Sequence, residues 1–167
     1  MVKFYNAVVT FSEIPEEVTL CIELTNCKIH CDGCHSPHLW EDVGEVLTNE
    51  VLKSLIEQND GITCVCFMGG DSNKEDVESL LWWIKDNTKL KTGWYRGIDD
   101  LNSPTLFQFI DYYKIGSYKK ELGGLDKKTT NQRMYKVTVD NSYNKKTLYK
   151  FKDITYKFWK HEIKNKN

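Results

Sequence analysis

Hydrophobic and polar residues alternate along the chain with two different spacings. Short apolar runs of strand length predict four strands, over residues 18–25, 62–68, 89–95 and 111–116. Apolar residues at helical spacing predict helices between them, over 49–59, 74–86 and around 103–110. Asn49 is the expected cap of the first helix. Strands that alternate with helices in this order predict a sheet of parallel strands.

The pattern changes after residue 117. A polar loop, a hairpin of two strands and its turn are expected over residues 118–133, 134–139 with 147–152, and 140–142. A short amphipathic helix with Tyr156, Trp159 and Ile163 on one face is expected to follow. Because no internal repeat or Gly/Pro/Ser-rich linker interrupts the 167 residues, we expect a single domain.

Composition places the chain among ordinary globular domains. Charged residues make up 28% and hydrophobic residues 40%, which excludes disordered and collagen-like classes. No apolar run approaches the roughly 18 residues of a membrane span, and the first residues do not resemble a signal peptide. We therefore expect a cytoplasmic protein with reduced thiols and no membrane partner.

Positive charge is concentrated near the carboxyl end. The formal net charge is −1, yet residues 144–167 hold eight Lys against Asp153 and Glu162. A basic extension interleaved with aromatic residues is compatible with an acidic partner, anionic lipid or nucleic acid. Because it matches no nucleic-acid-binding motif, we favour a solvated lysine-rich face whose aromatic residues pack on the domain. A nucleic acid partner is not expected.

The six cysteines fall into two groups. Three lie in apolar segments of strand type, where cysteine usually behaves as a small buried hydrophobe: Cys21, Cys64 and Cys66. The others form a Cys-x3-Cys-x2-Cys motif: Cys27, Cys31 and Cys34. Such a motif suits a tetrahedral zinc ion with His30, His35 or His38 as fourth ligand. It equally suits a 4Fe–4S cluster in which three thiolates leave one iron open to a substrate.

The cysteine motif resembles the signature of radical S-adenosylmethionine (SAM) enzymes. Cys27, Cys31 and Cys34 match its three cluster ligands in number and spacing, directly after a strand. The common form carries an aromatic residue before the third cysteine, where this chain has Gly33. Cys-x-Gly-Cys followed by Trp40 is similar, within that superfamily, to the activating proteins of the anaerobic ribonucleoside-triphosphate reductase.

Further segments extend this resemblance over roughly residues 5–140. Residues 69–71 are similar to a Gly-Gly-Asp segment of these proteins, and residues 93–97 to a Trp/Tyr-Thr/Ser-Gly segment. Residues 114–118 and 129–133 are similar to two later stretches of the same activating proteins. Two features depart from the family. Residues 14–17 replace a Gly-Pro-Gly turn, and the resemblance supplies no role for the basic extension after residue 144.

The resemblance implies an α/β fold, a partial (open) βα barrel of the radical SAM type with about four to five βα units and a C-terminal hairpin/helix extension. It also implies an oxidoreductase, a glycyl-radical-generating activating enzyme in which Cys27, Cys31 and Cys34 hold a 4Fe–4S cluster. An electron from the reduced cluster would cleave SAM, and the 5′-deoxyadenosyl radical would take hydrogen from a glycine. The implied partners are the glycyl radical subunit of the reductase and an electron donor such as flavodoxin.

The resemblance assigns the SAM pocket to residues around the third cysteine and to the Gly-Gly-Asp segment: Gly33, Cys34, His35, Gly69, Gly70 and Asp71. In this assignment Gly69 and Gly70 let the backbone approach the methionine amino group, because a Cβ there would collide with it. Asp71 pairs with the ammonium. The alternative is an ordinary strand-to-helix turn in which Asp71 caps the helix over 74–86.

Three other functions remain open from the sequence, the least favoured of which is a nucleic-acid adaptor built on the basic residues 144–167. A radical SAM enzyme acting on a small molecule, similar to carboxy-deazaguanine synthase, shares the cluster and the size. It needs substrate-binding residues and a magnesium site, for which the sequence has no clear motif. A zinc-binding interaction module would use the three clustered cysteines and one histidine. Iron content distinguishes the zinc module from the enzymes.

Overall fold

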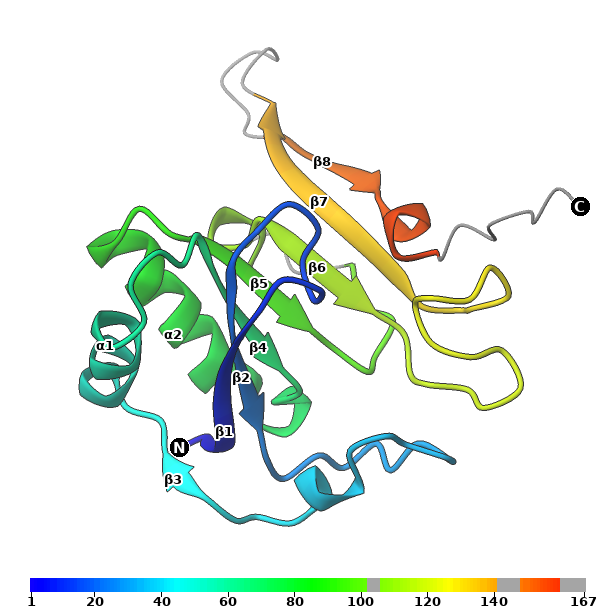
Figure 1. The fold of residues 1–167 in the computed structure, drawn as a ribbon, viewed down its shortest axis with the longest axis horizontal. Helices are drawn as coiled ribbons and strands as arrows, with labels where there is room; N and C mark the ends of the chain where they lie inside the picture. Colours follow the sequence, from blue (N-terminus) through cyan, green and yellow to red (C-terminus); the bar gives the residue numbers. More distant parts are fainter. Residues whose placement is uncertain (102–105, 141–147, 160–167) are drawn as a thin grey trace, which may run out of the picture.

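The computed structural model describes residues 1–101, 106–140 and 148–159, which form one mixed sheet with two α-helices (Figure 1). The strands are β1 (Lys3–Thr10), β2 (Thr19–Leu24), β3 (Glu45–Val46), β4 (Cys64–Met68), β5 (Lys91–Tyr95), β6 (Tyr112–Ile115), β7 (Arg133–Asp140) and β8 (Leu148–Asp153). The α-helices are α1 (Asn49–Glu57) and α2 (Lys74–Asn87). Short 3₁₀ helices cover Pro37–Trp40, Asp71–Asn73, Leu106–Gln108 and Thr155–Phe158.

The strand order is β3-β1-β2-β4-β5-β6-β7-β8. The four central strands, β2, β4, β5 and β6, are parallel, whereas β1, β3, β7 and β8 pair antiparallel. The four strands that the hydrophobic pattern predicts are these parallel ones, so this prediction is confirmed. Parallel strands bring their carboxyl ends to one edge of a sheet, where ligands bind in α/β proteins. The segments that follow β2, β4, β5 and β6 meet at that edge (Figure 1).

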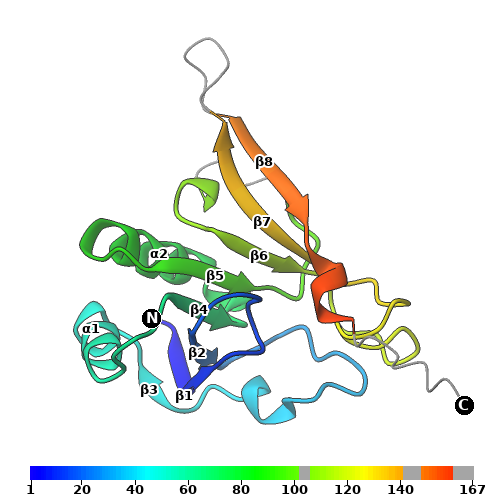
Figure 2. The same cartoon turned by 45° about the horizontal axis from the view of Figure 1, so that its top comes forward.

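The two helices cover one face of the sheet (Figures 1 and 2). Their buried residues pack on every second strand residue in one large core, which includes Leu20, Ile22, Leu24, Val65, Phe67, Leu52, Val77, Leu81 and Ile84. The opposite face carries a smaller core of Ile14, Cys21, Cys64, Cys66, Tyr112, Met134 and Ile154. The burial expected for Cys21, Cys64 and Cys66 is therefore confirmed. Burial also raises the pKa of the Cys66 thiol well above its usual range, which keeps it protonated.

Two predictions in the amino-terminal half differ from the structure. The hydrophobic pattern does not predict β1, because its Tyr5 and Val8 side chains are 57% and 48% exposed and no continuous apolar run marks it. The cap of α1 is Thr48, whose Oγ accepts the Val51 N–H at 3.3 Å. The expected cap at Asn49 is wrong by one residue, since Asn49 already belongs to the helix.

Predictions in the carboxyl-terminal half are partly confirmed. Leu106–Gln108 forms a 3₁₀ turn in place of the helix expected around 103–110, part of which lies outside the described residues. The hairpin is confirmed as β7 and β8, and its turn lies outside the described residues. Thr155–Phe158 forms a 3₁₀ helix where an amphipathic α-helix was expected to begin, and Ile163 lies outside the described residues.

Aromatic residues at the start of the basic extension pack on the domain, as expected. The Phe151 ring lies 4.7 Å from the ring of Phe107, and the Tyr149 ring lies 6.1 Å from it. Phe107 itself is 5% exposed and belongs to the large core. The hairpin is therefore anchored by aromatic contacts, which contribute about 0.5–1.5 kcal/mol each beyond their buried area.

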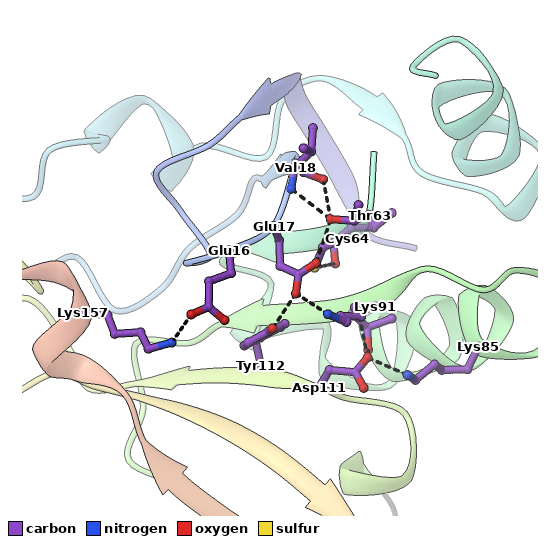
Figure 3. A network of polar contacts seen from close by, with 12 residues as sticks. Glu16, Glu17, Val18, Thr63, Cys64, Lys85, Lys91, Asp111, Tyr112 and Lys157 are labelled. Atoms are coloured by element: carbon purple, nitrogen blue, oxygen red, sulfur yellow. Dashed lines mark hydrogen bonds and ion pairs between the residues drawn. The ribbon is translucent and has the colours of Figure 1, made fainter. Parts of the chain in front are cut away.

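A polar network centred on Glu17 joins the amino-terminal ends of the parallel strands (Figure 3). The Glu17 carboxylate accepts hydrogen bonds from the Lys91 ammonium at 2.5 Å, the Tyr112 hydroxyl at 2.6 Å and the Thr63 hydroxyl at 2.7 Å. Burial by itself would raise the pKa of Glu17, but these three donors outweigh it and the pKa is lowered. The network therefore favours the ionised carboxylate.

Replacing Glu17 by Gln is expected to destabilise the fold by about 2–3 kcal/mol at neutral pH, because hydrogen bonds to a charged acceptor are lost. A lowered folded-state pKa contributes stability above the unfolded pKa, and that stability is lost as the pH falls through the folded pKa. Glu17→Gln should therefore flatten the dependence of stability on pH below about pH 5. Urea unfolding between neutral and acidic pH measures both effects.

Glu16→Gln is the matched control, since Glu16 pairs with Lys157 at 2.6 Å but is 66% exposed (Figure 3). Exposed ion pairs contribute little, so this variant should unfold close to wild type. An unchanged acid dependence in Glu17→Gln would show that the network does not govern acid unfolding.

Candidate functional site

The segment after β2 that carries Cys27, Cys31 and Cys34 is closed at its base by backbone hydrogen bonds. The Asn26 N–H donates to the Glu41 carbonyl and the Cys27 N–H to the Leu39 carbonyl, each at 3.0 Å. Within the segment, the Cys34 N–H donates to the Cys31 carbonyl at 3.1 Å. We call residues 27–39 the cysteine loop. Its two ends are pinned beside the carboxyl end of β2.

The backbone of the cysteine loop explains why position 33 is a glycine. Its φ of 69° lies in the left-handed region, which residues with a Cβ adopt at a cost. An added Cβ would also lie 3.3 Å from Cδ of Lys120, on the loop between β6 and β7. Glycine at this position therefore lets the turn before Cys34 form and lets the two loops approach each other.

All three cysteines of the loop line one pocket with a volume of about 180 Å³. The other walls come from the segments at the carboxyl ends of β4, β5 and β6 and from the loop before β7: Met68, Gly69, Asp71, Tyr95, Arg96, Gly97, Lys114, Gly116, Tyr118 and Gln132. Figures 1 and 2 both place the segment after β2 and the loop between β6 and β7 at the same end of the sheet. The structure thus brings the cysteine motif together with the Gly-Gly-Asp segment.

The chemistry of this donor set fits an iron–sulfur cluster. Cys27, Cys31 and Cys34 are free thiols with partial exposure, unlike the three buried cysteines. The Ser36 N–H donates to Cys34 Sγ at 3.4 Å, the kind of contact that tunes cluster sulfurs. Among the described residues, no three His, Cys, Asp or Glu side chains converge on one point suited to a single metal ion. Three thiols that line one pocket can each bind a separate iron of a 4Fe–4S cluster.

None of the three nearby histidines lines the cysteine pocket. The His30 ring stacks on Trp40 at 4.6 Å, and the His38 ring lies 5.0 Å from that of Tyr5. Both are exposed, as expected for residues on a loop surface. His35, which the resemblance places in the SAM pocket, lies against Tyr118 and lines a neighbouring cavity of about 440 Å³.

The two glycines after β4 have different surroundings. Gly69 lines the cysteine pocket, and its carbonyl accepts the Trp94 indole N–H at 2.7 Å. A Cβ on Gly70 would lie 2.6 Å from Leu24 Cδ1 and 2.8 Å from Val77 Cγ2, which are core atoms. The structural reason for glycine at position 70 is therefore core packing, whereas Gly69 is the one that faces the pocket.

Asp71 accepts two hydrogen bonds from the segment after β5. Arg96 Nε–H donates to one carboxylate oxygen at 2.7 Å, and the Gly97 N–H donates to the other at 2.8 Å. Arg96 is 2% exposed and also donates to the Tyr113 hydroxyl at 2.9 Å. The alternative in which Asp71 caps α2 is wrong, because Asn73 occupies the cap position. Asp71 instead connects the ends of β4 and β5.

Sequence reasoning missed two cations of this pocket, Arg96 and Lys114. Both lay within segments noted only for their resemblance to activating proteins. A signal was present, because Arg96 and Lys114 stand at the ends of predicted buried strands, where charged residues are rare. The contacts of Arg96 with Asp71 and Tyr113, and of Lys114 with the Arg96 carbonyl, join separate segments of the chain and could not be read from the sequence.

The residues matched by a family model span this whole site. A model described as a 4Fe-4S single cluster domain matches residues 17–138, from the start of β2 into β7. The chain belongs to this family of 4Fe–4S single cluster domains. The family occurs in radical SAM-related activating proteins. A 4Fe–4S cluster is therefore its cofactor, and the cysteine loop supplies the candidate ligands.

The match of this 4Fe–4S single cluster domain ends within β7 and leaves β8 and the basic extension outside. No curated protein and no solved structure matches the chain. In the part of the chain that the structure describes, no helix has both the length and the apolarity needed to cross a membrane.

Proposed function

We propose that this 4Fe–4S domain is a radical SAM activase that generates a glycyl radical on the anaerobic (class III) ribonucleoside-triphosphate reductase. One observation carries the proposal: the cysteine motif and the Gly69 and Asp71 positions, far apart in sequence, line the same pocket. That pocket lies at the carboxyl ends of parallel strands, where a cofactor is expected in α/β proteins. The resemblance of the same segments to reductase-activating proteins supplies the reaction.

In this proposal Cys27, Cys31 and Cys34 hold the cluster and leave one iron without a protein ligand. When bound, the cluster supplies the electron that cleaves SAM into methionine and a radical able to take hydrogen from glycine. Gly69, whose φ of 92° favours glycine, contributes to the pocket wall against which the methionine end of SAM would bind. Each carboxylate oxygen of Asp71 accepts one hydrogen bond, from Arg96 or from Gly97. Each oxygen retains a further lone pair, which could accept a hydrogen bond from the ammonium of SAM.

The proposed fold class is the partial βα barrel of the radical SAM type. Its parallel part would be β2, β4, β5 and β6, with the cysteine loop after the first of these strands. The sheet runs from β3 at one edge to β8 at the other without closing. An open sheet leaves side access to the pocket, which a glycine loop of a large partner needs. An electron donor such as flavodoxin would dock near the exposed cysteine loop.

Electron paramagnetic resonance tests this function. Reduced, cluster-loaded protein mixed with SAM and its cognate reductase should give a glycine-centred doublet, and methionine and 5′-deoxyadenosine should form in the same mixture. Changing the radical glycine of the reductase to alanine should remove the doublet while SAM cleavage continues. An intact cluster with SAM cleavage but no doublet would favour the small-molecule enzyme instead. Stoichiometric zinc without iron uptake would favour the interaction module.

A further inference from the structure

Lys114, near the carboxyl end of β6, is a buried cation in the wall of the cysteine pocket. The residue is 7% exposed. Its ammonium donates to the Gly116 carbonyl at 2.6 Å and to the Arg96 carbonyl at 3.2 Å. Among the described residues no carboxylate lies within ion-pair distance of it, and the two carbonyl contacts carry no net charge. The positive charge of Lys114 therefore has no direct counter-charge in the protein.

A lysine in this position is unusual because buried ammonium groups are normally paired with an anion. Arg96, the other buried cation of the pocket, has such a partner in Asp71 at 2.7 Å. Burial lowers the pKa of Lys114 to about 8. Lys114 lines the same pocket as the three cysteines of the loop, so a cluster held by these cysteines would lie beside its side chain.

The missing counter-charge corresponds to what a bound cluster would bring. Three ligating cysteines are thiolates, so the cluster together with its ligands is anionic. Reduction adds one more negative charge to the same place. In a site shielded from water, a nearby positive charge stabilises the reduced form more than the oxidised form, because Coulomb attraction grows with the added charge.

We propose that Lys114 is the counter-charge of the 4Fe–4S cluster and favours its reduced state. The inference rests on the cluster ligands of the proposed function, Cys27, Cys31 and Cys34, and goes beyond it by assigning an electrostatic role to a residue outside the motif. Lys114 touches no reacting atom in this role. It acts by holding positive charge at the pocket wall, fixed there by the carbonyls of Arg96 and Gly116.

A redox titration of the cluster-loaded protein without SAM tests the charge directly. Lys114→Met should make the cluster about tenfold harder to reduce, which lowers the midpoint potential by about 59 mV for a one-electron couple. Lys28→Met is the matched control, since Lys28 follows a cluster cysteine but is exposed and screened by water. Its potential should shift less than that of Lys114→Met. Equal potentials in Lys114→Met and wild type would overturn the proposal.

The stability of the variant with and without the cluster distinguishes an electrostatic role of Lys114 from a packing role. Without the cluster, Lys114→Met should be as stable as wild type or more so, because it removes a buried cation that has no counter-charge. With the cluster, the same variant should lose iron to a chelator about tenfold faster. A residue needed only for packing would destabilise both forms. If Lys114→Met and Lys114→Gln both unfold without the cluster, Lys114 is structural and the proposal is wrong.

Two further outcomes distinguish this inference from the proposed function. If Lys114→Met keeps the wild-type potential but binds SAM more weakly, then Lys114 binds the SAM carboxylate and the counter-charge role is wrong. If the potential falls as expected while no glycyl doublet forms with the reductase, the counter-charge role stands and the activase function fails. A variant that never assembles the cluster, although its cluster-free fold is stable and Lys28→Met assembles normally, supports the counter-charge role.

Discussion

Replacing Cys27, Cys31 or Cys34 by Ala should abolish the 4Fe–4S cluster in each case. All three thiols line one pocket, and removing one leaves two protein ligands for the cube. After anaerobic reconstitution, wild type should contain about four irons and four sulfides per chain. Each variant should contain almost none. Iron and sulfide analysis, together with loss of the brown colour, measures the effect.

Cys64→Ala and Cys66→Ala are the matched controls, since they remove the same side chain from inside strand β4 and not from the cysteine loop. Both thiols are fully buried, and burial raises their pKa values well above the usual range. Such thiols are poor ligands, so both variants should keep the cluster, with a loss of stability of about 1–2 kcal/mol from the space left behind. Retention of iron in Cys34→Ala, or its loss in Cys66→Ala, would contradict the ligand assignment.

The hydrophobic pattern predicts the parallel centre of the sheet and both α-helices because these elements are buried in ways that a periodicity records. The run over 62–68 has apolar residues on both faces, and β4 is covered on both sides. α2 repeats buried residues at helical spacing through Val77, Leu80, Leu81 and Ile84. In such segments one sequence pattern corresponds to one local structure.

The antiparallel edge of the sheet could not be predicted in the same way. β3 is only two residues long and is defined by pairing with Lys3 and Phe4 of β1. β1 in turn is held by its register with β2, in which Val8 lies opposite Cys21. Both strands depend on a partner from elsewhere in the chain, so tertiary contact overrides their weak local preference.

The candidate site shows the same division between local and distant information. The cysteine spacing is a local pattern and indicates a metal centre directly. The connection of Asp71 to Arg96 joins two strands and depends on the register in which Met68 pairs with Tyr95. That Lys114 has carbonyl and not carboxylate partners depends on how β6 packs beside the segment after β5 and the cysteine loop. Spacing can identify ligands, whereas charge balance requires the fold.

Asp71→Ala is expected to destabilise the cluster-free protein by about 3–5 kcal/mol, because it leaves the buried Arg96 guanidinium without its main partner. The Arg96 side chain is 1% exposed and that of Asp71 is 9% exposed, and the carboxylate that would remain near Arg96, that of Asp100, lies farther away at 3.6 Å. The Gly97 N–H loses its acceptor in the same variant. The shift in the urea unfolding midpoint measures this effect, and Arg96→Met and the double variant complete a mutant cycle.

Asp76→Ala provides the matched control, since Asp76 pairs with the amino-terminal ammonium at 3.3 Å and is 38% exposed. A surface ion pair contributes about 1 kcal/mol or less, so this variant should unfold near wild type. If Asp71→Ala binds SAM weakly yet unfolds like Asp76→Ala, the Asp71 carboxylate serves the ligand and not the fold. If stability falls and Arg96→Met restores part of it in the double variant, the pair is what connects the ends of β4 and β5. The carboxylate would then act on SAM from a position that Arg96 fixes.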